Sequence, residues 1–107
     1  MSRLEELEQM LDENPEDPFL IYALAPEYEN QNGTMQALLM YEHLVSNYPS
    51  YIGTYYHYAK LLYTAGNRAE ACNLLEKGIQ NGTVAKDIHA VNEMKGLLSL
   101  WRGEEDE

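Results

Sequence analysis

Residues 18–51 read PFLIYALAPEYENQNGTMQALLMYEHLVSNYPSY, and residues 52–85 read IGTYYHYAKLLYTAGNRAEACNLLEKGIQNGTVA. The second stretch repeats the pattern of the first at an offset of 34 residues. Small, apolar and proline positions recur in register: Pro15 with Pro49, Ile21 with Tyr55, Leu24 with Tyr58, Ala25 with Ala59, Tyr28 with Leu62, Ala37 with Ala71 and Tyr41 with Leu75. A fixed period of this length is typical of stacked repeats, which carry function on their surfaces.

Capping and turn residues divide the chain into about six short helices. Residues that begin helices occur at Ser2 with Glu5, Asp17 with Pro18, Ser50, Asn67 with Glu70, and Thr83. The predicted helices cover residues 2–13, about 18–33, 34–47, 51–65, 68–82 and 84–102. Apolar residues recur at helical spacing along the last of them, at Val84, Ile88, Val91, Met94, Leu98 and Trp101. The linkers are short, so consecutive helices should be antiparallel neighbours.

The composition is that of an acidic chain long enough for one domain. Its 107 residues carry 18 acidic and 7 basic side chains, a formal net charge of −11. The bases are scattered, whereas nucleic-acid binding requires clustered Lys and Arg, so we expect no nucleic-acid partner. The net charge favours a basic protein partner, although acidity can also serve solubility alone.

Cysteine use and the absence of long apolar runs indicate a cytoplasmic protein. Cys72 is the only cysteine, which excludes an internal disulfide and fits a reducing compartment. It follows Ala71 on a predicted helix interface and should be a small core residue. The N-terminus has no apolar stretch of signal-peptide type, and no run is long and apolar enough to span a bilayer.

No catalytic or metal-binding pattern is present in the sequence. His43, His57 and His89 lie far apart, on different predicted helices, and no second ligand stands at metal-site spacing. Gly-rich phosphate loops and nucleophile motifs are also missing. We therefore expect neither an enzyme nor a cofactor or metal protein.

The repeated residues resemble the tetratricopeptide repeat, a 34-residue unit of two antiparallel helices with small residues at its eighth and twentieth positions and a proline near its end. Ala25 and Ala37 would be the small pair of the first unit, and Ala59 and Ala71 that of the second. Alanine suits these places because it lets two helix axes approach to the near end of the usual ~8–10 Å range.

The resemblance implies a right-handed all-α solenoid in one domain over residues 1–103. Residues 2–13 would be the second half of a preceding repeat, and residues 84–102 a capping helix. The two repeats would occupy 18–51 and 52–83, the second drawing on the 34 positions up to residue 85. Residues 104–107 should form a disordered acidic tail because their charge opposes the helix dipole.

Two residues depart from the pattern. Gly78 stands where the first unit has Leu44, which either weakens its helix or allows tighter packing. Pro26 lies inside a predicted helix, where it removes the backbone partner of the Tyr22 carbonyl and costs ~3 kcal/mol. That carbonyl should then be open to a ligand.

The resemblance also places the first helix of each repeat on an inner, concave surface. The residues that we expect to bind a peptide there are Phe19, Tyr22, Pro26, Tyr56, His57, Lys60, Tyr63 and Met94. Tyrosines suit recognition because each offers apolar area and a hydroxyl group. The carboxylate clamp of some family members should be absent, since Lys60 is the only cation at these positions.

These residues predict a protein–protein interaction module that holds a peptide or partner segment in an aromatic groove. Alternatively, the aromatic side chains only close the gap between the inner helices and the capping helix. A second hypothesis is a homodimer, formed through the first helix or through Leu97, Leu100 and Trp101 at the end of the last one.

Overall fold

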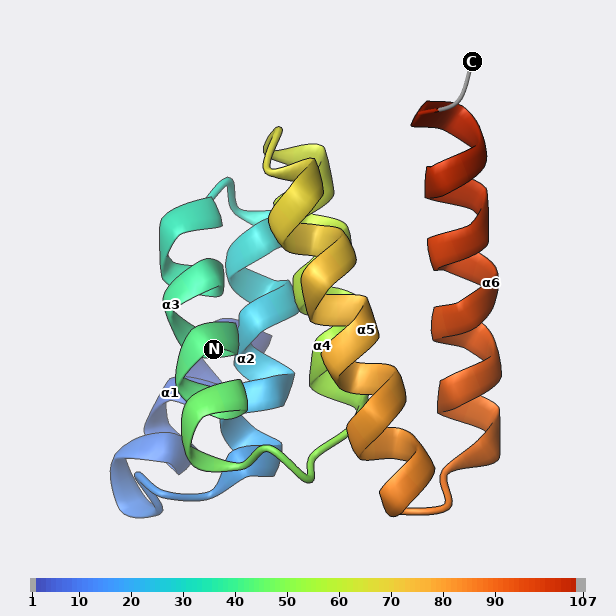
Figure 1. Cartoon of the computed structure of the whole chain (residues 1–107). Helices are drawn as coiled ribbons and strands as arrows, with labels where there is room; N and C mark the ends of the chain where they lie inside the picture. Colours follow the sequence, from blue (N-terminus) through green and yellow to red (C-terminus); the bar gives the residue numbers. More distant parts are fainter. Residues whose placement is uncertain (1, 106–107) are drawn as a thin grey trace. The chain divides into compact units, whose positions relative to one another are not determined.

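The computed structural model describes residues 2–105, which form helices and no strands. The helices are α1 (Arg3–Glu13), α2 (Pro18–Asn30), α3 (Thr34–Asn47), α4 (Gly53–Thr64), α5 (Arg68–Val84) and α6 (Ile88–Glu105). The predicted all-α helical repeat is confirmed. The single domain over residues 1–103 stays a prediction, and the chain divides after Tyr51 into two compact units. Unit 1 contains α1, α2 and α3, and unit 2 contains α4, α5 and α6 (Figure 1).

In unit 1, helix α2 packs against both α1 and α3. Ala25 of α2 and Ala37 of α3 are fully buried, as close approach of the two helices requires. Leucines of α1 and α2 complete the apolar core on the other side, where Leu7, Leu20 and Leu24 form a buried cluster. The repeated small and apolar positions therefore lie where the sequence predicts.

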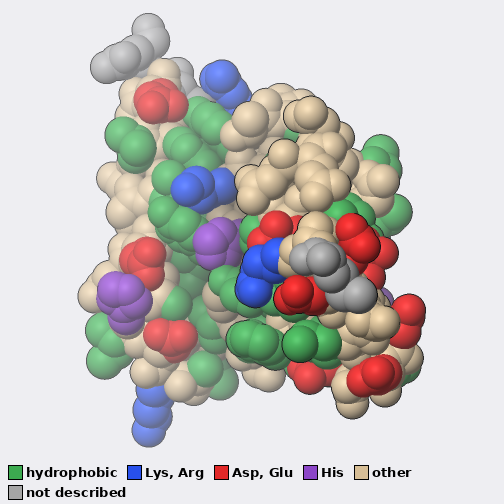
Figure 2. Space-filling view, turned by 180° about the vertical axis from the view of Figure 1, so that it is seen from behind, with side chains coloured by type: hydrophobic (Ala, Val, Ile, Leu, Met, Phe, Trp, Pro, Cys, Tyr) green, Lys and Arg blue, Asp and Glu red, His purple; other side chains and the backbone are tan. Residues whose placement is uncertain are grey.

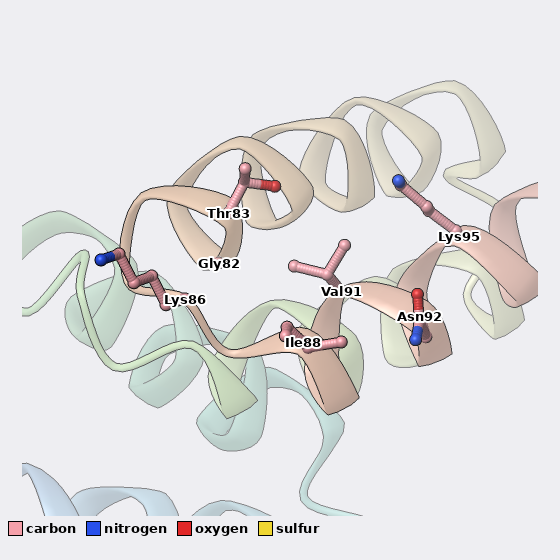
Figure 3. Close-up of a pocket in the computed structure, with 7 residues that line it drawn as sticks. All are labelled: Gly82, Thr83, Lys86, Ile88, Val91, Asn92 and Lys95. Atoms are coloured by element: carbon pink, nitrogen blue, oxygen red, sulfur yellow. The ribbon is translucent and has the colours of Figure 1, made fainter.

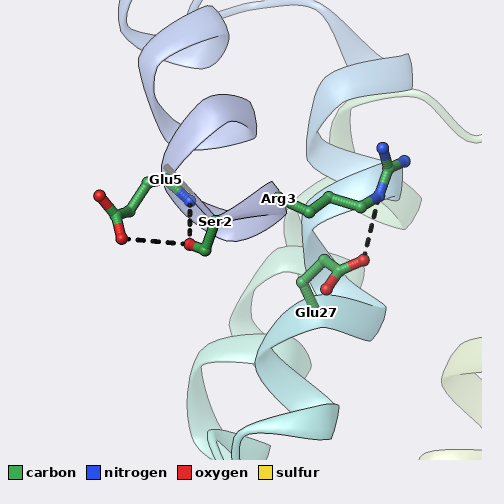
Figure 4. Close-up of polar contacts among 4 residues, drawn as sticks. All are labelled: Ser2, Arg3, Glu5 and Glu27. Carbon is green, nitrogen blue, oxygen red and sulfur yellow. Dashed lines mark hydrogen bonds and ion pairs between the residues drawn. The ribbon is translucent and has the colours of Figure 1, made fainter.

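Helix starts in unit 1 follow the predicted capping residues. Ser2 accepts a hydrogen bond from the Glu5 backbone N–H at 3.1 Å, and its hydroxyl donates to the Glu5 carboxylate at 3.2 Å (Figure 4). Asp17 accepts from the Phe19 N–H at 3.0 Å. An ion pair of 3.1 Å between Arg3 and Glu27 joins α1 to α2 (Figure 4).

Pro26 does not interrupt α2, which continues to Asn30. The tertiary contacts of Leu24 and Ala25, both fully buried, offset the loss of one backbone bond. That the Tyr22 carbonyl receives a ligand stays a prediction.

In unit 2, helix α5 packs against both α4 and α6. Its predicted end at Asn81-Gly82 is wrong, because the helix continues to Val84. Gly82 is buried inside the helix, and a Cβ there would lie 2.8 Å from the Val91 Cγ2 atom of α6. This glycine serves close helix packing rather than helix termination.

The turn between α5 and α6 consequently lies further along the chain than predicted. Lys86 takes the left-handed conformation that ends the helix, with φ of 61°. Asp87 caps α6 by accepting from the Ala90 N–H at 3.2 Å. Thr83 is not the cap, because its hydroxyl donates to the Ile79 carbonyl within α5 at 2.7 Å. The last helix therefore begins at Ile88 and not at the predicted residue 84, whereas the repeat boundary at residue 83 stays a prediction.

Two further helix ends differ from the prediction. Helix α4 begins at Gly53 with Ile52 as its N-cap residue, so Ser50 is not the cap. Helix α6 continues through Glu105, where the sequence predicted an acidic tail from residue 104. The Tyr63 hydroxyl donates to the Glu104 carboxylate at 2.9 Å, which helps to hold this last turn. Residues 106 and 107 of the predicted tail lie outside the described residues.

Thr54, in the first turn of α4, is fully buried, and its hydroxyl has no hydrogen-bond partner among the described residues. An unsatisfied buried hydroxyl costs ~1–3 kcal/mol. We therefore expect Thr54→Val to raise the free energy of unfolding by about 1 kcal/mol in urea denaturation followed by circular dichroism. Thr64→Val, at the exposed end of the same helix, should change it by less than about 0.5 kcal/mol. A destabilised Thr54→Val protein would contradict the prediction.

Candidate functional site

The exposed face of α2 in unit 1 carries three of the predicted site residues. Phe19, Tyr22 and Pro26 follow at spacings of three and four, which places them on one side of the helix. Phe19 is 62% exposed, and the other two are half-buried. The Tyr22 ring meets the Tyr51 ring edge-on, with 5.2 Å between centroids. This face holds an exposed phenyl ring beside a tyrosine whose ring is fixed by its neighbour.

The corresponding face of α4 in unit 2 carries Tyr56, His57 and Lys60. Tyr56 occupies the repeat position of Tyr22, 34 residues earlier, and Lys60 that of Pro26. The Tyr56 and His57 rings meet edge-on at 5.5 Å, and the Lys60 ammonium lies 5.2 Å from the centroid of the Tyr56 ring. A cation at that distance is attracted by the ring, so Tyr56 contacts both the Lys60 ammonium and the His57 ring.

Tyr63, also predicted to bind a ligand, makes its contacts within unit 2. Its ring stacks on the Trp101 ring at 4.1 Å and 8° between planes. The Arg68 guanidinium lies 4.9 Å from the Tyr63 centroid, and the Tyr63 hydroxyl donates to Glu104. The stacked pair joins α4 to α6, so Tyr63 stabilises the unit.

Met94 is a wrong prediction for the site, because its side chain is 0% exposed. Its sulfur packs over Gly78 of α5 and cannot reach a ligand. The sequence could have indicated this burial, because Met94 belongs to the row of apolar residues along the last helix. Of that row, Val91, Met94, Leu98 and Trp101 are buried, and only its first two members, Val84 and Ile88, are exposed.

The buried tyrosine hydroxyls bond within the fold. The Tyr41 hydroxyl donates to the Glu29 carboxylate at 2.8 Å. Burial is the main cause that raises the pKa of Tyr41 far above its usual value, and the hydrogen bond to Glu29 is the next. Tyr55 accepts from the Asn81 amide at 2.8 Å, and burial raises the pKa of Tyr55. These hydroxyls stay protonated at neutral pH and join helices within each unit.

In the part of the chain that the structure describes, the histidine and acidic side chains form no cluster of metal-ligand type. No group of three His, Cys, Asp or Glu side chains is placed to hold a metal ion there. His89 pairs with Glu93 at 2.8 Å on an exposed stretch of α6, and His43 contacts Asn47 within α3. Within residues 2–105, no helix combines the length and apolar character that crossing a bilayer requires.

Sequence reasoning missed the corner where α5 meets α6. Val84 and Ile88 are 84% and 71% exposed, and between them the chain makes its turn at Lys86. A pocket of about 370 Å³ opens beside the turn, lined by Gly82, Thr83, Lys86, Ile88, Val91, Asn92 and Lys95. The spacing of the apolar residues predicted a helix face. It could not show that no other helix covers the first two of them, Val84 and Ile88. On the face seen in Figure 2, hydrophobic side chains lie between acidic ones, and Lys and Arg are scattered.

Comparison with known proteins supports the repeat assignment. A tetratricopeptide repeat domain protein from Salinibacter ruber, solved in solution, is 32% identical to this chain, with a TM-score of 0.80, and the match covers 83% of this chain and 90% of that one. A crystal structure of a tetratricopeptide repeat domain protein from the same organism, also 32% identical, gives a TM-score of 0.78 over 82% and 98% of the two chains.

A protein from Bordetella parapertussis shares the fold, with a TM-score of 0.83 at 24% identity over 98% of this chain and 91% of that one. No protein-family model and no curated protein matches the chain. The 34-residue period, the buried alanines at matching positions of both units and the Salinibacter relatives agree. The chain belongs to the tetratricopeptide repeat family.

Proposed function

We propose that this protein is a protein–protein interaction module that binds partner segments through the face of α2 in unit 1 and, separately, through the face of α4 in unit 2. The observation that carries the proposal is the exposed Phe19 ring on α2, beside Tyr22 and Pro26. A phenyl ring left in water costs solvation free energy that a partner can recover, at roughly 25 cal/mol per Å² of apolar surface buried. Tyrosine and other aromatic side chains are also enriched among residues that dominate binding energy.

The α4 face supports the same proposal with different chemistry. Tyr56 offers an apolar ring, and Lys60 and His57 beside it offer donors to a partner's carbonyl or carboxylate groups. The net charge of −11 favours basic segments at long range. Cys72 is buried and is not in a disulfide, which suits work in a reducing compartment such as the cytoplasm.

The test uses peptides selected from a random phage-displayed library on the whole chain. We expect Phe19→Ala and Tyr56→Ala together to lower the affinity for the selected peptides by at least about tenfold, since each aromatic anchor contributes about 1–2 kcal/mol of binding free energy. Calorimetric titration of the synthetic peptides into the wild-type and variant proteins measures the loss.

Met35→Ala with Leu100→Ala is the matched control, because both side chains are exposed but lie on α3 and α6. The control protein should bind the peptides as the wild type does. Wild-type affinity in a folded Phe19→Ala and Tyr56→Ala protein would refute the proposal, and so would a selection that yields no peptide.

A further inference from the structure

The corner between α5 and α6 combines exposed apolar side chains with lysines. Its pocket is lined by Thr83 of α5 and by Val91 of α6, whose side chain points toward α5, with Lys86 at one end and Lys95 at the other (Figure 3). Ile88 is 71% exposed at its rim. The corner thus offers an apolar floor between two ammonium groups.

The charges at this corner differ from those of the chain as a whole. Of the seven bases of this acidic chain, two line one pocket, and no acidic residue lines it. Neither Lys86 nor Lys95 has a carboxylate or aromatic partner among residues 2–105, whereas Arg3 and Arg102 pair with glutamates. Asp87, next to the pocket, uses a carboxylate oxygen to cap α6. The lining of the pocket itself therefore carries two cations and no anion, with the Asp87 carboxylate beside it.

The hollowed surface continues along α6 beyond the pocket. A second hollow is lined by Lys95, Leu98, Ser99, Arg102 and Gly103, so Lys95 belongs to both. From Ile88 to Arg102 the strip covers 14 residue steps, or about 21 Å at 1.5 Å per residue. A strip of that length suits a helix of a partner rather than a small anion. Arg102, at the far end of the strip, is already paired with Glu76, so Lys86 and Lys95 are the cations left for a partner.

We propose that the strip formed by Lys86, Ile88, Val91, Lys95 and Arg102 docks an acidic amphipathic helix of a partner protein. Apolar side chains of that helix would cover Ile88 and enter the pocket toward Val91, and its flanking carboxylates would pair with Lys86 and Lys95. At physiological salt, exposed charges more than ~8 Å apart are largely screened, so the charges at the strip matter more to a docked helix than the net charge of the whole chain. The strip lies outside the α2 and α4 faces, and the two proposals can fail separately.

The test uses a panel of designed amphipathic peptides with leucines on one face and glutamates beside them, and the same peptides with lysines in place of the glutamates. We expect the acidic peptides to bind the whole protein and to shift the amide resonances of Lys86, Ile88, Val91 and Lys95 in ¹⁵N-edited NMR spectra. Affinity should fall as salt is raised, because exposed ion pairs contribute to it. The basic peptides should bind at least about tenfold more weakly.

The matched variants distinguish binding at this strip from a general effect of the protein's charge on peptide binding. Lys86→Asn combined with Lys95→Glu should weaken the binding of the acidic peptides by at least about tenfold. Asparagine is chosen at position 86 because it tolerates the left-handed backbone there. Lys77→Glu, on an exposed part of α5 outside the pocket, should leave affinity within about twofold. Lys95→Glu alone, with the backbone of the turn untouched, should give an intermediate loss.

Three results would overturn the proposal. The first is no binding of any acidic peptide up to about 1 mM. The second is equal binding of the acidic and basic panels. The third is equal loss of affinity in the pocket variants and in Lys77→Glu.

Discussion

Trp101→Ala should lower the free energy of unfolding of unit 2 by about 3–5 kcal/mol, as expected for a large aromatic side chain removed from a core. Trp101 is 5% exposed and stacks on Tyr63 of α4. Its loss removes the aromatic contact between the last turns of α6 and α4 and leaves a cavity that backbone relaxation fills only in part. Chemical denaturation followed by circular dichroism measures the change, since the substitution removes the only tryptophan.

The neighbouring Leu100→Ala is the control for this prediction. Leu100 lies on the same turn of α6 but is exposed, so its truncation should cost less than about 0.5 kcal/mol. In the wild-type protein, Trp101 fluorescence should report the docking of α6. If Trp101→Ala lost no more stability than Leu100→Ala, the stacked pair would not hold α6 in place.

Gly78→Ala should lower the free energy of unfolding by about 2 kcal/mol, although alanine is the better helix former. A Cβ at this position would lie 2.6 Å from both the Met94 Sδ atom and the Tyr55 Cβ atom. The Met94 sulfur can move, but the Tyr55 Cβ is fixed to its backbone, so helices α4 and α5 must separate. Overpacking of this kind costs up to about 3 kcal/mol, and the helix preference of alanine over glycine offsets about 1 kcal/mol of it.

Gly96→Ala provides the opposite expected result within the same unit. Apart from the adjoining backbone of α6 itself, no atom of the described residues lies within 4 Å of a Cβ built at Gly96, so only the helix preference remains. We expect this variant to gain about 1 kcal/mol in the same denaturation measurement. Two glycine variants that changed stability in the same direction would show that packing does not decide the role of Gly78.

Sequence periodicity predicted most of the fold because helix faces are encoded locally. The alanines at matching positions of the repeats are buried in both units, as the 34-residue offset required. Helix α3 begins and ends at the predicted residues, and Ser2 and Asp17 cap α1 and α2 as expected. These features depend on spacing and on side chains within a few residues of each other.

The candidate site was less predictable because exposure depends on what distant residues cover. Phe19 and Met94 were assigned to one surface from their repeat positions, yet one is exposed and the other fully buried. Gly82 looked like a helix end, and only its contact with Val91 shows why the helix runs through it.

The sequence by itself determined that this chain is a repeat of antiparallel helix pairs with small residues at their contacts. The tertiary structure decided that Tyr63 is engaged with Trp101, and that an apolar corner between Lys86 and Lys95 stays open. The physical reason is that a helical period specifies which side of a helix is apolar, whereas burial depends on whether another helix supplies atoms to cover that side.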